Sequence, residues 1–154
     1  MYIIIDGYNL LKSFYDSYLE EDRDELLKII EAYRKTKMCK ITVVFDGHSS
    51  YGNYNREHIV GGTRVLYSPS GISADRKIMD LVRQTGKGVI IVSSDRALKE
   101  AVEKMGAVTI SSAEFSKKLL SYEKDEEDIE KFDYKSVKKL KKSNRLRAKL
   151  LKKL

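Results

Sequence analysis

Three short apolar segments of this chain each lead to an aspartate. Residues 2–5 are followed by Asp6, residues 41–45 by Asp46, and residues 88–92 by two serines and then Asp95. Apolar segments of this length, rich in β-branched residues, are typical of strands buried on both faces of a parallel sheet. The carboxyl ends of parallel strands lie at one edge, where open α/β folds bind their ligands. We therefore expect three carboxylates at one edge of a sheet.

The segments between these strands favour alternating helices and strands. Helical spacing of apolar residues predicts helices over residues 22–36, 73–84, 95–105 and 112–122, with Ser73 and Ser94 as N-caps. Shorter strands are expected at 64–67 and 107–110, a sharp turn at Asp6-Gly7, a short helix or loop over 10–18, and a long loop over 47–62. This alternation predicts an α/β fold with a parallel sheet covered on both faces.

Charge divides the chain into two parts. The net charge is +7 at pH 7, of which residues 1–122 carry +2, residues 123–130 carry −5 and residues 131–154 carry +10. We expect an α/β domain over 1–122, and an acidic hinge with a basic amphipathic helical tail over 123–154. A basic tail on a nearly neutral domain indicates attraction to a polyphosphate or another anionic surface.

Several protein classes are not favoured. The single Cys39 excludes a disulfide framework and a cysteine-based zinc site, and it favours a reducing compartment. No apolar stretch is long enough to cross a membrane and no signal peptide is evident, so a cytoplasmic location is expected. Neither a dinucleotide-binding glycine motif nor a Walker A sequence occurs. A haloacid-dehalogenase-type phosphatase would need an aspartate where Tyr8 stands, and a receiver domain would need a lysine at the end of the last strand, near Ser111.

Four acids are candidates for catalysis: Asp6, Asp46, Asp75 and Asp95. Taken singly, each has an ordinary explanation, because Asp-Gly is a common turn and a carboxylate is favoured in the first turn of a helix. Taken together, the predicted topology brings all four to one edge, where carboxylates without matching lysines repel one another unless a cation binds them. Oxygen ligands of this kind suit Mg²⁺ or Mn²⁺. Metal-dependent nucleases need this arrangement to polarise a phosphate and activate water.

Polar residues near these acids are candidate supporting groups. Asn9 is a candidate neutral ligand or water-positioning group, and Ser94, with Ser93 beside it, offers a hydroxyl. Arg76 and Arg96 are candidates for contacts to phosphate, although an ordinary surface role is equally compatible with their positions. His48 and His58 are isolated in a polar segment, which is more typical of solvated side chains than of ligands.

Four motifs of this chain occur together, in this order: Asp6-Gly7-Tyr8-Asn9-Leu10-Leu11, Val44-Phe45-Asp46-Gly47, Ser73-Ala74-Asp75 with Ile78, and Val92-Ser93-Ser94-Asp95-Arg96-Ala97-Leu98. Over residues 1 to about 120 the chain resembles the YacP-like branch of the NYN domain family, whose members are related to PIN-domain ribonucleases. The resemblance implies a PIN-like three-layer α/β/α sandwich with a mainly parallel central sheet, and an endoribonuclease that depends on Mg²⁺ or Mn²⁺.

The resemblance also implies roles for individual residues. By position, Asp6, Asp75 and Asp95 are expected to bind metal, with Asp46 as a fourth catalytic acid. Asn9 and Ser94 become supporting polar groups. Many members carry a further acid directly after the Ala-Asp pair, where this chain has Arg76, so the number of metal ions stays open.

These observations predict a cytoplasmic endoribonuclease that hydrolyses RNA, with mRNA or rRNA on the ribosome among its candidate substrates. The basic tail is expected to attract RNA phosphates, although an anionic membrane or plain solvent is an alternative. Tyr8, Tyr51 and Tyr54 are candidates for stacking on bases, with ordinary packing as the alternative. The alternatives for the whole protein are a non-catalytic RNA- or ribosome-binding protein and a structure-specific DNA nuclease.

Overall fold

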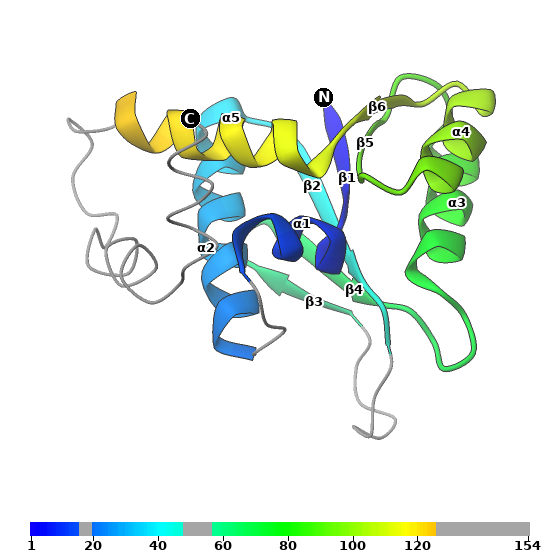
Figure 1. Ribbon diagram of the computed structural model, residues 1–154, viewed down its shortest axis with the longest axis horizontal. Coiled ribbons are helices and arrows are strands. Elements are labelled where there is room, and N and C mark those ends of the chain that lie inside the picture. The colour runs from blue at the N-terminus through cyan, green and yellow to red at the C-terminus, as the bar shows by residue number, and fades with distance from the viewer. Residues whose placement is uncertain (16–19, 48–56, 126–154) are drawn as a thin grey trace.

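The computed structural model describes residues 1–15, 20–47 and 57–125. Within these ranges the chain forms a six-stranded sheet and five helices (Figure 1). The strands are β1 (Tyr2–Asp6), β2 (Lys40–Phe45), β3 (Glu57–Val60), β4 (Thr63–Tyr67), β5 (Ile90–Val92) and β6 (Val108–Ile110). The helices are α1 (Gly7–Phe14), α2 (Glu20–Lys37), α3 (Ala74–Thr85), α4 (Arg96–Lys104) and α5 (Ser112–Asp125).

The first strand lies in the middle of the sheet. The strand order is β3-β4-β2-β1-β5-β6, and all neighbouring pairs are parallel except β3 and β4. β1 therefore has strand partners on both sides, and its apolar residues Ile3, Ile4 and Ile5 are at most 2% exposed. The prediction of a mainly parallel sheet built around this strand is confirmed.

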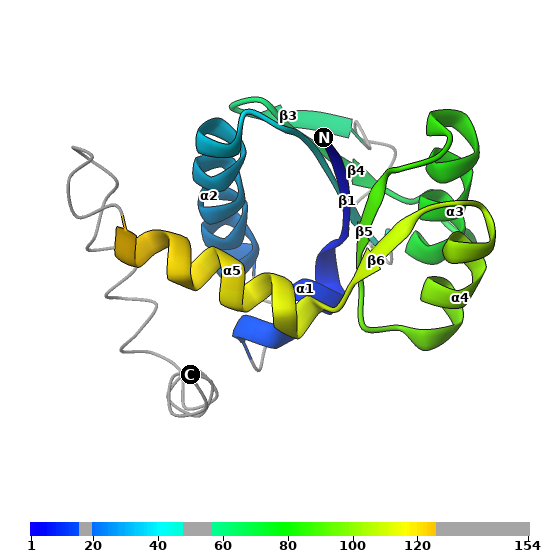
Figure 2. The same ribbon diagram turned by 90° about the horizontal axis from the view of Figure 1, so that it is seen from above.

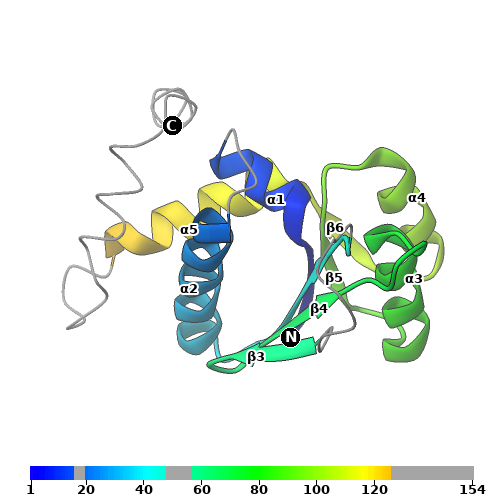
Figure 3. The ribbon, with the colours of Figure 1, turned by 90° about the horizontal axis from the view of Figure 1, so that it is seen from below.

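Helices cover both faces of the sheet, which gives the expected three layers. Because side chains alternate along a strand, Ile3 and Ile5 pack in the core beneath α1, α2 and α5, whereas Ile4 packs in the core beneath α3 and α4. Figures 2 and 3 show the two groups of helices on opposite sides of the sheet. The helical spacing that predicted α2, α3, α4 and α5 corresponds to these two buried faces.

One strand falls inside the segment predicted to be a long loop. β3 pairs antiparallel with β4 and forms the sheet's edge, and the two strands are joined at Gly61 and Gly62. Its residues are mostly exposed, so the strand lacks the apolar run on which strand prediction relies. The predicted loop over 47–62 is therefore wrong at 57–60. Residues 48–56, with His48, Tyr51 and Tyr54, lie outside the described residues.

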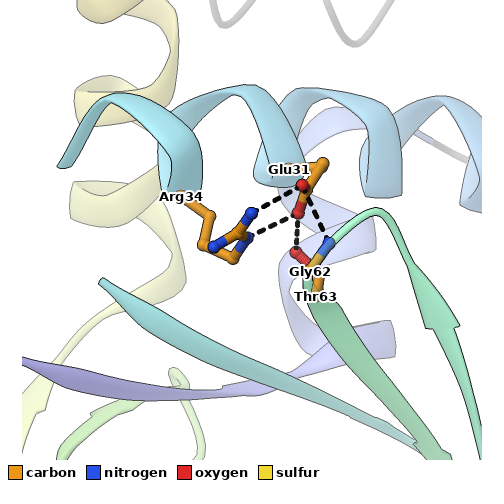
Figure 4. Close-up of polar contacts among 4 residues, drawn as sticks. All are labelled: Glu31, Arg34, Gly62 and Thr63. Carbon is orange, nitrogen blue, oxygen red and sulfur yellow. Dashed lines mark hydrogen bonds and ion pairs between the residues drawn. The ribbon is translucent and has the colours of Figure 1, made fainter. Parts of the chain in front are cut away.

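A buried carboxylate connects this edge hairpin to α2. Glu31 accepts hydrogen bonds from Arg34, at 2.7 and 2.9 Å, from the Gly62 N–H at 2.9 Å, and from the Thr63 hydroxyl at 2.6 Å (Figure 4). Burial alone would raise the pKa of Glu31, but these donors and the Arg34 charge lower it to about 2. The Glu31 carboxylate therefore holds the β3–β4 turn against the helix.

The change of direction predicted at Asp6-Gly7 occurs where β1 passes directly into α1, with no separate turn between them. Gly7 has a negative φ and is the first residue of α1. Its lack of a side chain matters because a Cβ there would lie 2.5 Å from Cδ1 of the Phe45 ring. The glycine thus serves close packing of α1 on β2.

The last described helix extends beyond the predicted domain boundary. α5 continues to Asp125, so the first three residues of the predicted acidic hinge are helical. Residues 126–154, including the predicted tail helix, lie outside the described residues. Among the helices that the structure describes, none combines the length and apolar character needed to cross a membrane.

Candidate active site

A pocket opens at the carboxyl ends of the central strands. The chain builds β2 and β4 on one side of β1, and β5 and β6 on the other. Ligands of open α/β folds bind where the strand order reverses in this way. The pocket has a volume of about 400 Å³ and is lined by Asp6, Tyr8, Asn9, Lys12, Asp46, Ala74 and Asp75. Three of the four predicted acids thus share one pocket.

Asp6 is the most buried of these acids. It ends β1, is 8% exposed, and accepts a hydrogen bond of 3.0 Å from the Ser93 hydroxyl. The pKa of Asp6 is raised from 3.8 to about 6, mainly by burial and further by the charges of Asp75 and Asp95. The hydrogen bonds from Ser93 and from the Asn9 backbone act in the opposite direction and lower this pKa. Asp6 therefore keeps its proton to a higher pH than a solvent-exposed aspartate does.

Asp75 lies in the first turn of α3, as predicted. The helix begins after Ser73, whose hydroxyl accepts a hydrogen bond from the Arg76 N–H at 3.2 Å. Burial raises the pKa of Asp75, and the charges of Asp95 and Asp46 raise it further. Asp95 does not line the pocket, but it is close enough to act electrostatically on both Asp6 and Asp75.

Asp46 is positioned by a serine that the sequence analysis did not identify. The Ser68 hydroxyl donates a hydrogen bond to Asp46 at 3.2 Å and accepts one from the Gly47 N–H at 3.0 Å. A Cβ on Gly47 would lie 1.9 Å from the Ser68 carbonyl oxygen, so only glycine fits here. Ser68 follows β4 directly. This position at the carboxyl end of a strand is the only sequence feature that could have identified Ser68 as a site residue.

Asp95 has a structural role at the start of α4. One of its carboxylate oxygens accepts a hydrogen bond from the Leu98 N–H at 3.0 Å, which makes Asp95 the N-cap. The prediction that Ser94 caps this helix was wrong by one residue. The Asp95 N–H also donates to the Ser93 hydroxyl at 3.1 Å. Ser93 therefore links Asp95 to Asp6.

Asn9 holds three segments together. Its side-chain oxygen accepts hydrogen bonds from the Ser94 N–H at 2.7 Å and from the Ser112 hydroxyl at 2.5 Å. The Ser94 hydroxyl in turn accepts from the Ser112 N–H at 3.1 Å. Because the backbone N–H of Ser94 can only donate, the Asn9 side-chain atom that it contacts must be the amide oxygen. What Asn9 can present to the pocket is its NH₂ group, a donor, rather than a metal-binding oxygen.

The basic residue at the pocket is not one of those the sequence analysis selected. Arg76 and Arg96 are exposed and do not line the pocket, and Arg96 forms an ion pair with Glu100 at 3.0 Å along its own helix. Lys12 does line it. The expectation of acids without a matching lysine is therefore corrected. Lys12 lies four residues after Tyr8, a spacing that becomes informative only once α1 is known to begin at Gly7.

The chemistry of the pocket suits a hydrated divalent cation. Its candidate ligands are carboxylate oxygens, which Mg²⁺ and Mn²⁺ prefer. Among the described residues, no three Asp, Glu, His or Cys side chains lie close enough to form a complete metal site. Proteins usually bind Mg²⁺ through one or two carboxylates and retain several of its waters. The acids present fit binding of that kind.

Acids at the carboxyl edge of a parallel sheet, within an α/β/α sandwich, are the arrangement expected for a PIN-like nuclease fold. Residues 3–154 match the YacP-like NYN domain, and the chain belongs to this family of PIN-like ribonucleases. The match confirms the family that the motifs indicated. It extends beyond residue 120, where the predicted resemblance ended.

Two crystal structures of Rae1 (YacP) from Bacillus subtilis have a similar fold. One has a TM-score of 0.70 and 22% sequence identity, and the match covers 92% of this chain and 82% of that one. The other, of the W164L mutant, has a TM-score of 0.67 and 22% identity, covering 98% and 90%. A comparison with curated protein sequences gives no match.

Proposed function

We propose that this protein is a metal-dependent endoribonuclease that hydrolyses RNA phosphodiester bonds at the pocket. The observation that carries the proposal is that Asp6, Asp46 and Asp75, from three separate motifs, line one pocket. Burial and neighbouring acids raise the pKa of both Asp6 and Asp75. Such mutually repelling carboxylates at a solvent-open pocket are typical of a site for a cation and a substrate. Membership of a ribonuclease family supports RNA as the substrate.

The site residues have distinct roles in this proposal. Asp6 and Asp75 would hold a hydrated Mg²⁺ or Mn²⁺, and the nearby charge of Asp95 would add to the attraction for the cation. The bound ion would polarise the phosphate and lower the pKa of an attacking water. Asp46 is the fourth acid of the site, and a hydrogen bond from the Ser68 hydroxyl orients its carboxylate.

The fold keeps these groups in place before RNA binds. Ser93 donates to Asp6 and accepts from the Asp95 N–H, so the ends of β1 and the start of α4 are held together. The Asp95 cap restrains that carboxylate in the same way.

The test compares the wild type with Asp6→Asn and Asp75→Asn, and with Asp80→Asn as the matched control. Asp80 is on the same helix as Asp75, but it pairs with Arg83 at 2.7 Å and does not line the pocket. Each protein is incubated with a pool of single-stranded and structured RNA in Mg²⁺, in Mn²⁺ and in EDTA. Cleavage should require metal, fall by on the order of 100-fold or more in the two pocket variants, and stay unchanged in the control.

Other results would contradict the proposal. Full cleavage by both Asp6→Asn and Asp75→Asn would show that the site is elsewhere. RNA binding without cleavage, in solution and on ribosome-bound message, would favour the non-catalytic RNA-binding alternative. Equal cleavage of a DNA pool of matched sequence would show that the enzyme does not distinguish RNA from DNA.

A further inference from the structure

Helix α1 supplies the pocket with one aromatic and one basic side chain. Tyr8 and Lys12 both line the pocket. They are four residues apart on the helix, so they lie on the same face, one turn from each other. Neither belongs to the carboxylate group that the proposed chemistry uses. The same helix face therefore offers two additional contacts to a bound molecule.

Lys12 can offset the charge that would repel RNA. A phosphate entering the pocket meets Asp6, Asp46 and Asp75, and like charges at close range are unfavourable. Lys12 is exposed, and it is the one basic residue among the side chains that line this pocket in the described part of the chain. A lysine ammonium is a strong partner for a phosphate oxygen. Lys12 is thus suited to contact the RNA backbone.

Tyr8 is a supported aromatic side chain. Its ring packs edge-to-face on Phe45, with centroids 5.0 Å apart. Phe45 is fully buried and stacks in turn on Tyr67 at 5.5 Å. Tyr8 itself is half-buried and is among the residues that line the pocket. An aromatic ring held in this way gives a base a surface on which to stack with little loss of conformational entropy.

We propose that Tyr8 and Lys12 form a nucleotide-binding subsite beside the acids. Lys12 binds a backbone phosphate, and Tyr8 stacks on the base of a neighbouring nucleotide. A base inside a double helix is already stacked on both sides, so it is not available to Tyr8. The subsite therefore selects a single-stranded segment of RNA over a duplex. This substrate class rests on the proposed endoribonuclease function, whereas the binding contacts are testable without cleavage.

The experiment measures equilibrium binding and cleavage with the full chain. The probes are one fluorescent single-stranded RNA and the same strand annealed to its complement. Binding is followed in EDTA over a range of salt concentrations, and single-turnover cleavage in Mg²⁺ gives the half-saturating enzyme concentration and the maximal rate separately. The variants are Lys12→Met, Lys12→Arg, Tyr8→Leu and Tyr8→Phe. Lys28→Met is the control, because Lys28 is exposed on α2 and does not line the pocket.

Each variant has a specific expected result. Lys12→Met should weaken binding several-fold and reduce the salt slope by about 0.7, the value for one phosphate contact on a single strand. Tyr8→Leu should weaken single-strand binding between about 5-fold and 150-fold, with little effect on the duplex. Both should raise the half-saturating concentration more than they lower the maximal rate. Lys12→Arg and Tyr8→Phe should restore binding, and Lys28→Met should match the wild type.

The outcomes separate this subsite from the proposed function. If Lys12→Met keeps the wild-type salt slope and Tyr8→Leu keeps the single-strand preference, the subsite is wrong even where RNA is cut. If both variants behave as expected but the wild type cuts no RNA, the endoribonuclease proposal fails and the subsite stands. Wild-type protein that neither binds nor cuts either probe would overturn both.

Discussion

The Asp6 carboxylate is unfavourable to ionise in the folded protein. It is buried at the end of β1, and Asp75 and Asp95 add negative charge nearby, so its pKa rises from 3.8 to about 6. Active sites often retain such groups at the expense of stability, because the chemistry requires them. Replacing this residue should therefore affect stability and activity in opposite directions.

We expect Asp6→Asn to be more stable than the wild type at pH 8 in metal-free buffer. Because the pKa of Asp6 is raised in the folded state, the folded state keeps this proton to a higher pH than the unfolded state does. The wild type consequently loses stability as the pH rises from 3.8 through 6. The uncharged variant avoids this loss, for a gain of about 1–3 kcal/mol. Urea unfolding of both proteins at pH 3.5 and pH 8 in EDTA measures it.

Two further observations would check the interpretation. The difference between the proteins should nearly vanish at pH 3.5, where Asp6 is protonated in both states of the wild type. Added Mg²⁺ should stabilise the wild type and have little effect on Asp6→Asn, because a ligand stabilises the state that binds it. An Asp6→Asn protein that is less stable than the wild type at pH 8 would contradict the assigned cause of the pKa shift.

At the scale of elements, the edge hairpin depends on the Glu31 carboxylate of α2. Glu31→Gln removes the charge that Arg34, Gly62 and Thr63 surround, and we expect it to cost about 2–3 kcal/mol at pH 7. The folded pKa of Glu31 is lowered, so this stabilisation is present above pH 4.5 and is lost as the pH falls toward 2. Thermal or urea unfolding at pH 7 and at pH 2.5 tests both statements.

The matched control is Glu100→Gln, which removes an exposed ion pair. Glu100 pairs with Arg96 at 3.0 Å, but the Arg96 side chain is 91% exposed, and exposed pairs of this kind contribute little. The control should change stability by less than about 0.5 kcal/mol. Equal losses in the two variants would show that burial of Glu31 adds nothing to its contribution.

Helices and strands could be predicted where the residue types themselves indicate burial or helix capping. The apolar run Ile3-Ile4-Ile5 predicts a buried strand, which is observed as β1. Ser73 predicts the start of a helix, and α3 begins at the next residue. β3 could not be found in this way, because an exposed edge strand needs no apolar run. The sequence also could not show that Asp95 rather than Ser94 is the N-cap of α4, since both residue types cap helices well.

The site was predictable to a similar depth. The acids follow strands or open helices, so topology alone brings Asp6, Asp46 and Asp75 to one pocket. Their supporting hydrogen bonds join residues distant in the sequence: Ser93 is 87 positions from Asp6, and Ser112 is 103 from Asn9. Nothing local predicts such partners.

At the scale of the whole molecule, charge is concentrated at one end of the chain. Residues 131–154 carry a net charge of +10, against +2 for residues 1–122. Deleting 131–154 should weaken RNA binding and flatten its dependence on salt, because fewer counterions are released from the RNA. Anisotropy titrations of full-length and shortened protein at several salt concentrations measure both effects.

The same deletion should leave the chemistry unchanged. The residues that line the pocket lie within residues 6–75, and Ser93, Asp95 and Ser112, which support it, also precede the deleted segment. The single-turnover rate at saturating RNA should therefore match that of the full chain. An unchanged salt slope after deletion would show that the tail does not contact RNA phosphates.

The position of β1 in the sheet has a consequence for how the protein is made. β1 is translated before its neighbour β5, and Asn9 completes its hydrogen bonds only with Ser112, which is translated later still. A partly synthesised chain can hold all four acids and still lack the segments that fix them. Since domains fold as units during synthesis, the pocket can assemble fully only after Ser112 has been translated. Fragments that end before Ser112 should therefore lack the proposed nuclease activity, which should appear only when α5 is present.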